Sequence, residues 1–292
     1  MTAVDTATTN APIVAQVRPA FESSRAALVG LLLRDLNVLW KNKFEFVIRT
    51  LVQPFLLVFV FLYVFPTIGQ GVGSGGGTAG ESRFATILVP GVVGISIMFQ
   101  GIQAVAMTLS QEFGFTREIE DRVQAPCPVW LVAATKVLSG AAQGVLAALI
   151  VFPIAAVVHA NGVHAHLTVH WLTLLTILPP ACIAFSALGL LLGTIFEPRN
   201  IGLMFGFIVL PITFLGGTYY AWTSLAPVEV GPFHWLQTLA LVNPLIYVNE
   251  GLRAALTQSP HMHLYVIYPV LLLACALFMR LGIRGFKKRV LS

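Results

Sequence analysis

Long stretches without charged residues alternate with short charged segments along most of the chain. No Asp, Glu, Lys or Arg occurs between Arg49 and Glu81, Arg83 and Glu112, Lys136 and Glu197, Arg199 and Glu229, or Arg253 and Arg280. A helix needs about 20 apolar residues to cross the roughly 30 Å hydrocarbon core of a bilayer. The gap after Lys136 is long enough for two crossings, and the polar stretch 159–170 divides it. We therefore predict an all-α integral membrane protein with six spans, at residues 47–65, 86–109, 131–158, 171–196, 201–222 and 264–283.

The composition agrees with this pattern. Of the 292 residues, 57% are hydrophobic and only 10% are charged, whereas a soluble domain has about 25% charged residues. So few charges cannot cover a surface that faces water. Most of the outside must therefore face lipid, and we expect membrane lipid to be a contact of the chain.

The basic residues predict the orientation of the six spans. Only Arg83 and Arg253 fall on one side of the membrane. The remaining basic residues share the other side: Arg18, Arg25, Arg34, Lys41, Lys43, Arg49, Arg117, Arg122, Lys136, Arg199, Arg280, Arg284, Lys287, Lys288 and Arg289. Cytoplasmic segments carry such an excess of Lys and Arg. We predict a multi-pass protein of the inner (plasma) membrane with both termini in the cytoplasm. Topology thus accounts for the net charge of +5, and we predict no nucleic-acid partner.

Two segments outside the spans also have a membrane pattern. After a tail at residues 1–20, which we expect to be mobile, residues 21–43 predict an amphipathic helix that lies in the membrane surface. Its apolar face contains Leu28, Leu32, Leu36 and Leu39, and its polar stripe contains Arg34, Asn37 and Lys41. Either this helix only anchors the first span or its polar face contacts a cytoplasmic partner. Residues 230–249 are free of charge but contain two prolines, so we predict one or two short re-entrant helices at the outer surface.

The segment 111–128 concentrates charge in a chain that is otherwise poor in it. Its charged residues are Glu112, Arg117, Glu118, Glu120, Asp121 and Arg122. If the segment is helical, Phe115, Ile119 and Val123 form a narrow apolar stripe, and Pro126 and Pro128 end the helix. Two interpretations stay open. The helix either lies on its own membrane domain or docks onto a cytoplasmic protein, with Phe113 and Phe115 as anchors.

Several kinds of chemistry are not supported by the sequence. The glycine-rich segment 69–80 lacks the Lys-Ser or Lys-Thr of a phosphate-binding loop, so an ATP-driven function would need a second polypeptide. The predicted spans contain no Asp or Glu, which argues against an ion-coupled carrier. Two groups of histidines lie on the predicted outer side, but no carboxylate or cysteine joins them, and we predict no metal site. These histidines are His159, His164, His166 and His170, and then His261 and His263.

Four polar residues of the second and third predicted spans are candidates for lining a transport pathway. They are Ser96, Gln100, Gln103 and Gln143. Side chains of this kind also form hydrogen bonds between membrane helices, and both interpretations stay open.

Three stretches of the chain resemble the membrane permeases of type-2 ABC exporters, a family that includes polysaccharide, nodulation-factor and daunorubicin-resistance exporters. Residues 117–128 (REIEDRVQAPCP) resemble the charged cytoplasmic loop of that family, and residues 210–220 (LPITFLGGTYY) resemble the end of its fifth span. The third and most specific stretch is 242–253 (VNPLIYVNEGLR). These stretches occur in the order and with the spacing of this family. Together with the six predicted spans, the resemblance covers nearly the whole chain from residue 21 onward.

The resemblance implies a set of partners and site residues. The chain would pair with a second permease copy or a paralogue, and the pair with two cytoplasmic ATP-binding ABC subunits that carry ATP and Mg, while the chain itself binds no cofactor. Residues 112–122 would form the coupling helix, with Glu112, Phe113, Phe115, Arg117, Glu118, Ile119, Glu120, Asp121 and Arg122 against the ATPase. The outer re-entrant segment would contain Asn243, Pro244, Tyr247, Glu250 and Arg253.

These observations predict a permease subunit of an ABC exporter that moves an amphiphilic or lipid-linked substrate and has no catalytic residues of its own. Two other classes remain open. One is a stand-alone carrier or channel, and the other is a structural membrane assembly factor without an ATPase partner. The pattern does not identify the substrate, and it does not distinguish a homodimer from a heterodimer.

Overall fold

A computed structural model describes residues 20–70, 77–116, 128–158, 160, 162–227 and 234–291 of the chain. Within these ranges every regular element is helical, and six helices are long and apolar enough to cross a membrane. The prediction of an all-α membrane protein with six spans is confirmed. The expected N-terminal tail and most of the charged segment 111–128 lie outside the described residues.

Three of the six spans contain π-helical or 3-10 turns. The first span consists of α2 (Lys43–Val58), the π-helical η1 (Phe59–Val64) and α3 (Phe65–Thr67). The second is α4 (Gly77–Gln111), which continues into the π-helical η2 (Glu112–Thr116). The third, fourth and sixth are α6 (Val129–Val157), α7 (Trp171–Ile195) and α12 (Leu264–Leu291). The fifth joins η3 (Pro198–Asn200), α8 (Ile201–Met204), the π-helical η4 (Phe205–Val209) and α9 (Leu210–Leu215).

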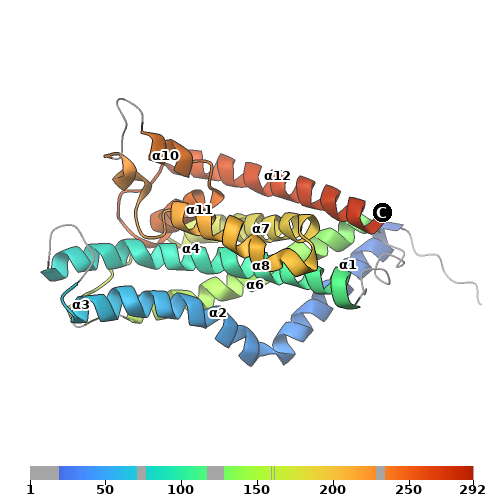
Figure 1. Cartoon of the computed structure of the whole chain (residues 1–292), viewed down its shortest axis with the longest axis horizontal. Helices are drawn as coiled ribbons and strands as arrows, with labels where there is room; N and C mark the ends of the chain where they lie inside the picture. The colour runs from blue at the N-terminus through green and yellow to red at the C-terminus, as the bar shows by residue number, and fades with distance from the viewer. Residues whose placement is uncertain are drawn as a thin grey trace, which may run out of the picture.

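The remaining elements lie at the two ends of the bundle. They are α1 (Ala20–Lys41), the 3-10 turn η5 (Trp222–Leu225), α10 (Trp235–Ala240) and α11 (Pro244–Leu256). The spans run along the long axis of the molecule, with α1 and the C-terminus at one end and α3 and α10 at the other (Figure 1). An even number of spans places the start and the end of the helical region on the same side, as the sequence predicts. Which side is cytoplasmic stays a prediction.

Several helix ends differ from the predicted span boundaries. The fifth span was expected to reach residue 222, but its helix ends at Leu215 because Gly216 and Gly217 follow and Gly217 has a left-handed φ of 67°. The second span was expected at residues 86–109, but its helix runs from Gly77 through Thr116. Charged residues limit the apolar stretch without ending the helix. Glu112 and Phe113 therefore belong to the end of this span and not to a separate loop helix.

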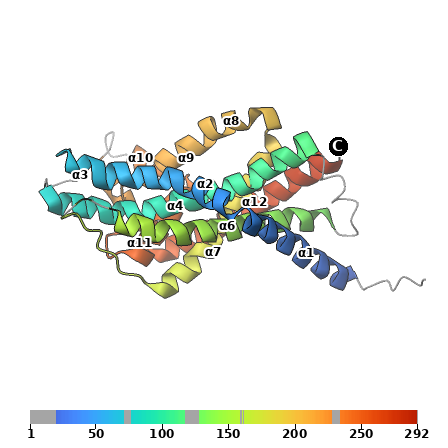
Figure 2. The ribbon, with the colours of Figure 1, turned by 90° about the horizontal axis from the view of Figure 1, so that it is seen from below.

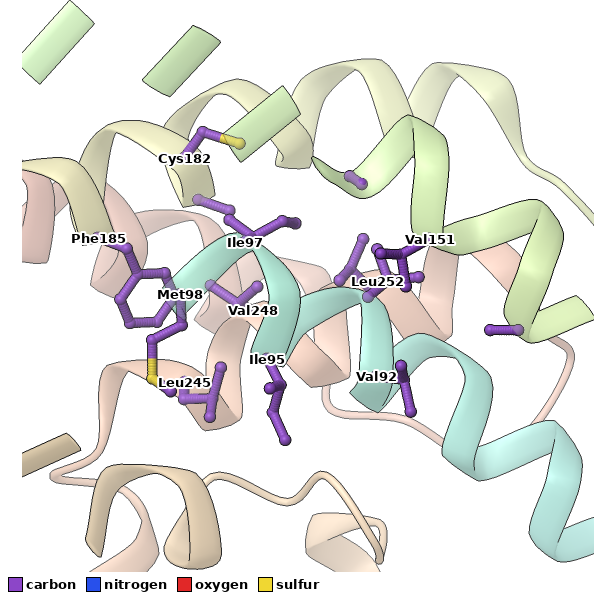
Figure 3. Close-up of a cluster of buried hydrophobic side chains, with 14 of the residues drawn as sticks. Val92, Ile95, Ile97, Met98, Val151, Cys182, Phe185, Leu245, Val248 and Leu252 are labelled. Carbon is purple, nitrogen blue, oxygen red and sulfur yellow. The ribbon is translucent and has the colours of Figure 1, made fainter. Parts of the chain in front are cut away.

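The second span is the centre of the bundle. In its most apolar stretch 89% of the residues are buried, against 22%, 17% and 17% in the first, fifth and sixth spans. α4 packs against α6, α7 and α11, and Figure 3 shows its side chains among theirs. The labelled residues are Val92, Ile95, Ile97 and Met98 of α4, Val151 of α6, Cys182 and Phe185 of α7, and Leu245, Val248 and Leu252 of α11.

Glycines allow α4 and α7 to approach closely. A Cβ atom at Gly189 of α7 would lie 2.9 Å from the Cα atom of Ile102, and one at Gly193 would lie 3.0 Å from the Cα atom of Ala106. Lipid tails are as apolar as the helix faces, so helix association in a bilayer depends on close van der Waals packing of this kind.

We expect Gly189→Leu to lower the free energy of unfolding by about 1–3 kcal/mol, because the added side chain must displace the α4 backbone. Gly206→Leu is the matched control, since a Cβ atom there has no heavy atom within 4 Å. Thermal unfolding of both variants in the same detergent measures the difference. Equal stability of the two variants would contradict the packing that the structure shows.

Candidate functional site

A buried ion pair joins the second and third spans near the end of the bundle where α1 lies. Nζ of Lys136 in α6 donates to Oε1 of Glu112 at 2.7 Å, and each side chain is 6% exposed. This pairing was not predicted from the sequence. Lys136 is the only charged residue of α6. A single charged residue in an apolar membrane helix indicates that an oppositely charged residue lies at the same depth in a neighbouring helix.

Phe113 packs within the bundle. Its ring is half-buried, lies 6.0 Å from the ring of Phe286 in α12, and has the guanidinium carbon of Arg289 at 4.5 Å from its centroid. Nη1 of Arg289 also donates to the carbonyl oxygens of Gly193, Thr194 and Phe196, at 3.0, 3.3 and 2.9 Å. Phe113 was expected as an anchor for a partner protein, but in this structure it ties the end of the second span to α12.

The rest of the predicted coupling helix is not described. Arg117, Glu118, Ile119, Glu120, Asp121 and Arg122 lie outside the described residues, and for Phe115 only the backbone lies within them. Their contact with an ATPase stays a prediction. The structure does fix both ends of this segment, because Thr116 ends η2 and Val129 begins α6.

A chain of hydrogen bonds crosses three spans in the middle of the bundle. Oγ1 of Thr50 in α2 donates to Oε1 of Gln100 in α4, and Nε2 of Gln100 donates to Oε1 of Gln143 in α6, both at 3.1 Å. The hydroxyl of Ser96 instead donates to the carbonyl of Val92 in its own helix at 2.7 Å. Gln103 is half-buried on α4. Gln100 and Gln143 thus bond between helices, while a role of these residues in a pathway stays a prediction.

A polar cavity of about 240 Å³ lies between α1, α4 and α6. It contains both partners of the Glu112–Lys136 pair and one end of the hydrogen-bond chain. Its lining residues are Arg34, Asp35, Val38, Ala104, Thr108, Gln111, Glu112, Lys136, Ser139 and Gln143. We refer to it below as the polar cavity.

At the other end of the bundle, Glu250 and Arg253 of α11 form a second ion pair, 2.7 Å long, with both side chains fully buried. Oε1 of Glu250 accepts from the backbone N–H of Trp222, and Oε2 accepts from that of Met262, each at 2.8 Å. Nη2 of Arg253 donates to the carbonyl oxygens of Gly217 and Tyr220. The pair therefore holds the turn after the fifth span and the segment before the sixth.

Asn249 and Asn243 complete this arrangement. Nδ2 of Asn249 donates to the carbonyl of Gly216, and Nδ2 of Asn243 donates to that of Ile212, each at 2.7 Å. Asn243 also caps α11, because its Oδ1 accepts from the N–H of Leu245 at 2.9 Å. Pro244 is the first residue of that helix, where its missing N–H costs nothing. We refer to Asn243, Asn249, Glu250 and Arg253 as the outer polar cluster, after the orientation that the basic residues predict.

The predicted short helices are present in this region as α10 and α11. The hydroxyl of Tyr247 joins them, since it donates to the carbonyl of Leu241 at 2.9 Å. α11 extends to Leu256, seven residues beyond the predicted end at 249, because Glu250 and Arg253 find partners inside the fold. The depth of these helices in the membrane stays a prediction.

Burial shifts the pKa values of two groups in this region. Burial lowers the pKa of the Arg253 guanidinium, and the adjacent Glu250 carboxylate opposes this shift. Burial also raises the pKa of the Tyr220 hydroxyl, so it stays protonated at neutral pH. Among the described residues, no three His, Cys, Asp or Glu side chains gather in a way that could hold a metal ion.

Comparison with known proteins gives a consistent result. The pattern of the family described as "ABC-2 type transporter" matches residues 26–257. The "Inner membrane transport permease YadH" of Escherichia coli K12 is 31% identical over 173 residues, which cover 58% of this chain and 62% of the relative. The protein of the same name from Shigella flexneri has the same identity and coverage. The match thus covers less than two thirds of these relatives.

The family match includes the Glu112–Lys136 pair, the hydrogen-bond chain and the outer polar cluster. The region that matches the family thus makes up most of the length of this membrane protein. This chain belongs to the ABC-2 type transporter family.

Proposed function

We propose that the chain is the membrane-spanning permease subunit of an ABC exporter in the inner membrane. It moves an amphiphilic substrate out of the cytoplasm, and a separate ATP-binding subunit, which carries ATP and Mg, supplies the energy. The sequence contains no phosphate-binding loop, so the proposal assigns ATP hydrolysis to that partner. The family assignment carries this proposal, and the contacts around residues 112–136 support it.

The segment 117–127, which contains most of the charged residues of the proposed coupling helix 112–122, connects two helix ends that are fixed to one another. The Glu112–Lys136 pair joins these ends directly, and Phe113 joins the first of them to α12. A force from an ATPase on this segment would therefore act on α4, α6 and α12 together. Packed helices transmit such a force as a rigid-body shift, since interiors are dense and resist deformation.

The same motion would reach the middle of the membrane. Thr50, Gln100 and Gln143 connect α2, α4 and α6 through hydrogen bonds, so a shift of α4 together with α6 would also act on α2. At the outer end, the outer polar cluster holds the turn after the fifth span. We propose that the substrate leaves beside this turn and the re-entrant helices α10 and α11.

A second permease copy or a paralogue completes the proposed transporter. The first, fifth and sixth spans bury only 22%, 17% and 17% of their most apolar stretches within the chain. Apolar faces of this size need a covering of lipid or protein. The proposed pair would cover part of them, and membrane lipid would cover the rest.

We expect the tagged chain, purified from its native membrane in a mild detergent, to co-elute with an ATP-binding subunit at near equal stoichiometry and with ATPase activity. Phe115→Asp and Ile119→Asp should each lose the subunit, because a charge placed in the apolar stripe opposes docking. Arg199→Asp is the matched control. It adds the same residue to the predicted cytoplasmic side, at an 81% exposed position outside the coupling segment.

Three results would contradict parts of this proposal. A chain that elutes alone and transports substrate would be a stand-alone carrier. A chain that retains an ATPase but moves no substrate in vesicles would be an assembly factor. Normal transport by both Asp variants would show that the segment does not dock the ATPase.

A second prediction concerns the outer polar cluster. We expect Arg253→Met to lower the free energy of unfolding by about 3–5 kcal/mol, because it leaves the Glu250 carboxylate buried without its cation. The double variant Glu250→Gln, Arg253→Met should recover part of this loss, since no buried charge remains. Unfolding of the wild type, both single variants and the double variant forms the thermodynamic cycle. Additive losses would mean that the two side chains are not coupled.

A further inference from the structure

Helix α1 lies over α6 and leaves a cavity on each side of the contact. The polar cavity lies on the side of α4. A second cavity, of about 330 Å³, lies on the side of α7. We refer to it as the apolar cavity, because Leu32 and Leu36 of α1, Ala142 and Val145 of α6, and Ile183 of α7 are among its lining residues. Figure 2 shows α1 beside α6 at this end of the bundle.

The two cavities share one lining residue, Ser139. This α6 residue lines both of them, and one turn further along the helix the neighbours Ala142 and Gln143 line the apolar and the polar cavity respectively. The same division occurs on α1, where Leu36 lines one cavity and Asp35 the other. The structure thus has a polar space on one side of the α1–α6 contact and an apolar space on the other.

The charges of the polar cavity restrict what it can hold. Two cationic side chains, Arg34 and Lys136, face two anionic ones, Asp35 and Glu112, so the formal charge of the lining is zero. Thr108, Gln111, Ser139 and Gln143 add uncharged donors and acceptors. An anionic head group would meet the like charges of Asp35 and Glu112, and a cationic one those of Arg34 and Lys136. A head group without net charge meets neither excess and can form hydrogen bonds with the polar lining.

We propose that the two cavities form a binding site for an amphiphile, with a net-neutral, hydrogen-bonding head group in the polar cavity and a single apolar chain in the apolar cavity. This assignment rests on the proposed export function, because it names the class of substrate that the permease would receive. Binding itself can be measured on the purified chain without an ATPase.

The test uses photoreactive alkyl probes that share one chain and differ in the head group. A maltoside is uncharged, a phosphocholine is zwitterionic, and a phosphate monoester is anionic. The full chain in lipid nanodiscs is labelled with each probe, and the labelled peptides are identified by mass spectrometry. We expect the maltoside and the phosphocholine to label peptides of α1 and α6 at lower concentration than the phosphate does.

Substitutions on α6 locate the site. Ala142→Trp fills the apolar cavity and should weaken labelling about tenfold, which corresponds to about 1.4 kcal/mol of binding free energy. Leu149→Trp is the matched control, since Leu149 lies on the same helix, is 62% exposed and lines neither cavity. If Ala142→Trp fails to fold, as judged by gel filtration, Val145→Trp takes its place in the comparison.

A charge substitution tests the head group. Asp35→Asn gives the lining a net charge of +1 and should shift the preference toward the alkyl phosphate, while Val38→Leu, on the same helix and at the same cavity, should not. A purely structural role of Asp35 would lower the labelling by all three probes equally.

The outcomes separate this site from the proposed function. Equal labelling of wild type and Ala142→Trp, or preference of the wild type for the alkyl phosphate, would overturn the site even if an ATPase co-elutes. Labelling that depends on Ala142 in a chain that recruits no ATPase would support the site and contradict the exporter.

Discussion

The buried pair of Glu250 and Arg253 makes the end of the fold at α10 and α11 possible. The chain leaves the helical conformation after Leu215, and non-helical backbone in apolar surroundings has carbonyl and N–H groups without partners. Glu250 accepts from two of these N–H groups, and Arg253 donates to two of the carbonyls. Each ion also neutralises the other, which limits the cost of burying both. Without the pair, these backbone groups would be buried without partners. Either ion alone would be a buried charge without a counter-ion.

This constraint explains why two stretches that resemble the exporter family occur together. The stretch 210–220 contains the turn, and the stretch 242–253 contains the side chains that satisfy it. α4 also packs closely against both stretches. A Cβ atom at Gly91 would lie 2.3 Å from the carbonyl oxygen of Thr218, and one at Gly94 would contact the Asn249 side chain. The packing therefore links Gly91 and Gly94 of the second span to the turn and to α11. A change in any of these parts affects the others.

The sequence was sufficient to predict the six spans, because the length of each stretch without charged residues indicates whether an apolar helix can cross the membrane. It was not sufficient for the helix ends. A charge does not end a helix, and the end at Leu215 depends on Gly217 adopting a left-handed φ. The partners of buried charges were also missed. Glu112 and Lys136 are 24 residues apart, and Glu250 bonds to Trp222, 28 residues away. Such pairs depend on the position of one helix relative to another along their axes. The hydrophobic pattern within a single helix does not indicate this position.

The distribution of polar contacts distinguishes a rigid part of the chain from a part that can move. α4, α6, α7 and α11 share the main core, and the outer polar cluster fixes α11 to the turn after the fifth span. The packing around α1 is different, because a cavity lies on each side of its contact with α6. Moving α1 therefore breaks fewer close contacts than moving any core helix. π-helical turns in the first and fifth spans add places where helices can bend. A shift imposed at the Glu112–Lys136 end would thus change the position of α1 and the first span relative to the core helices, while the core helices keep their packing against one another.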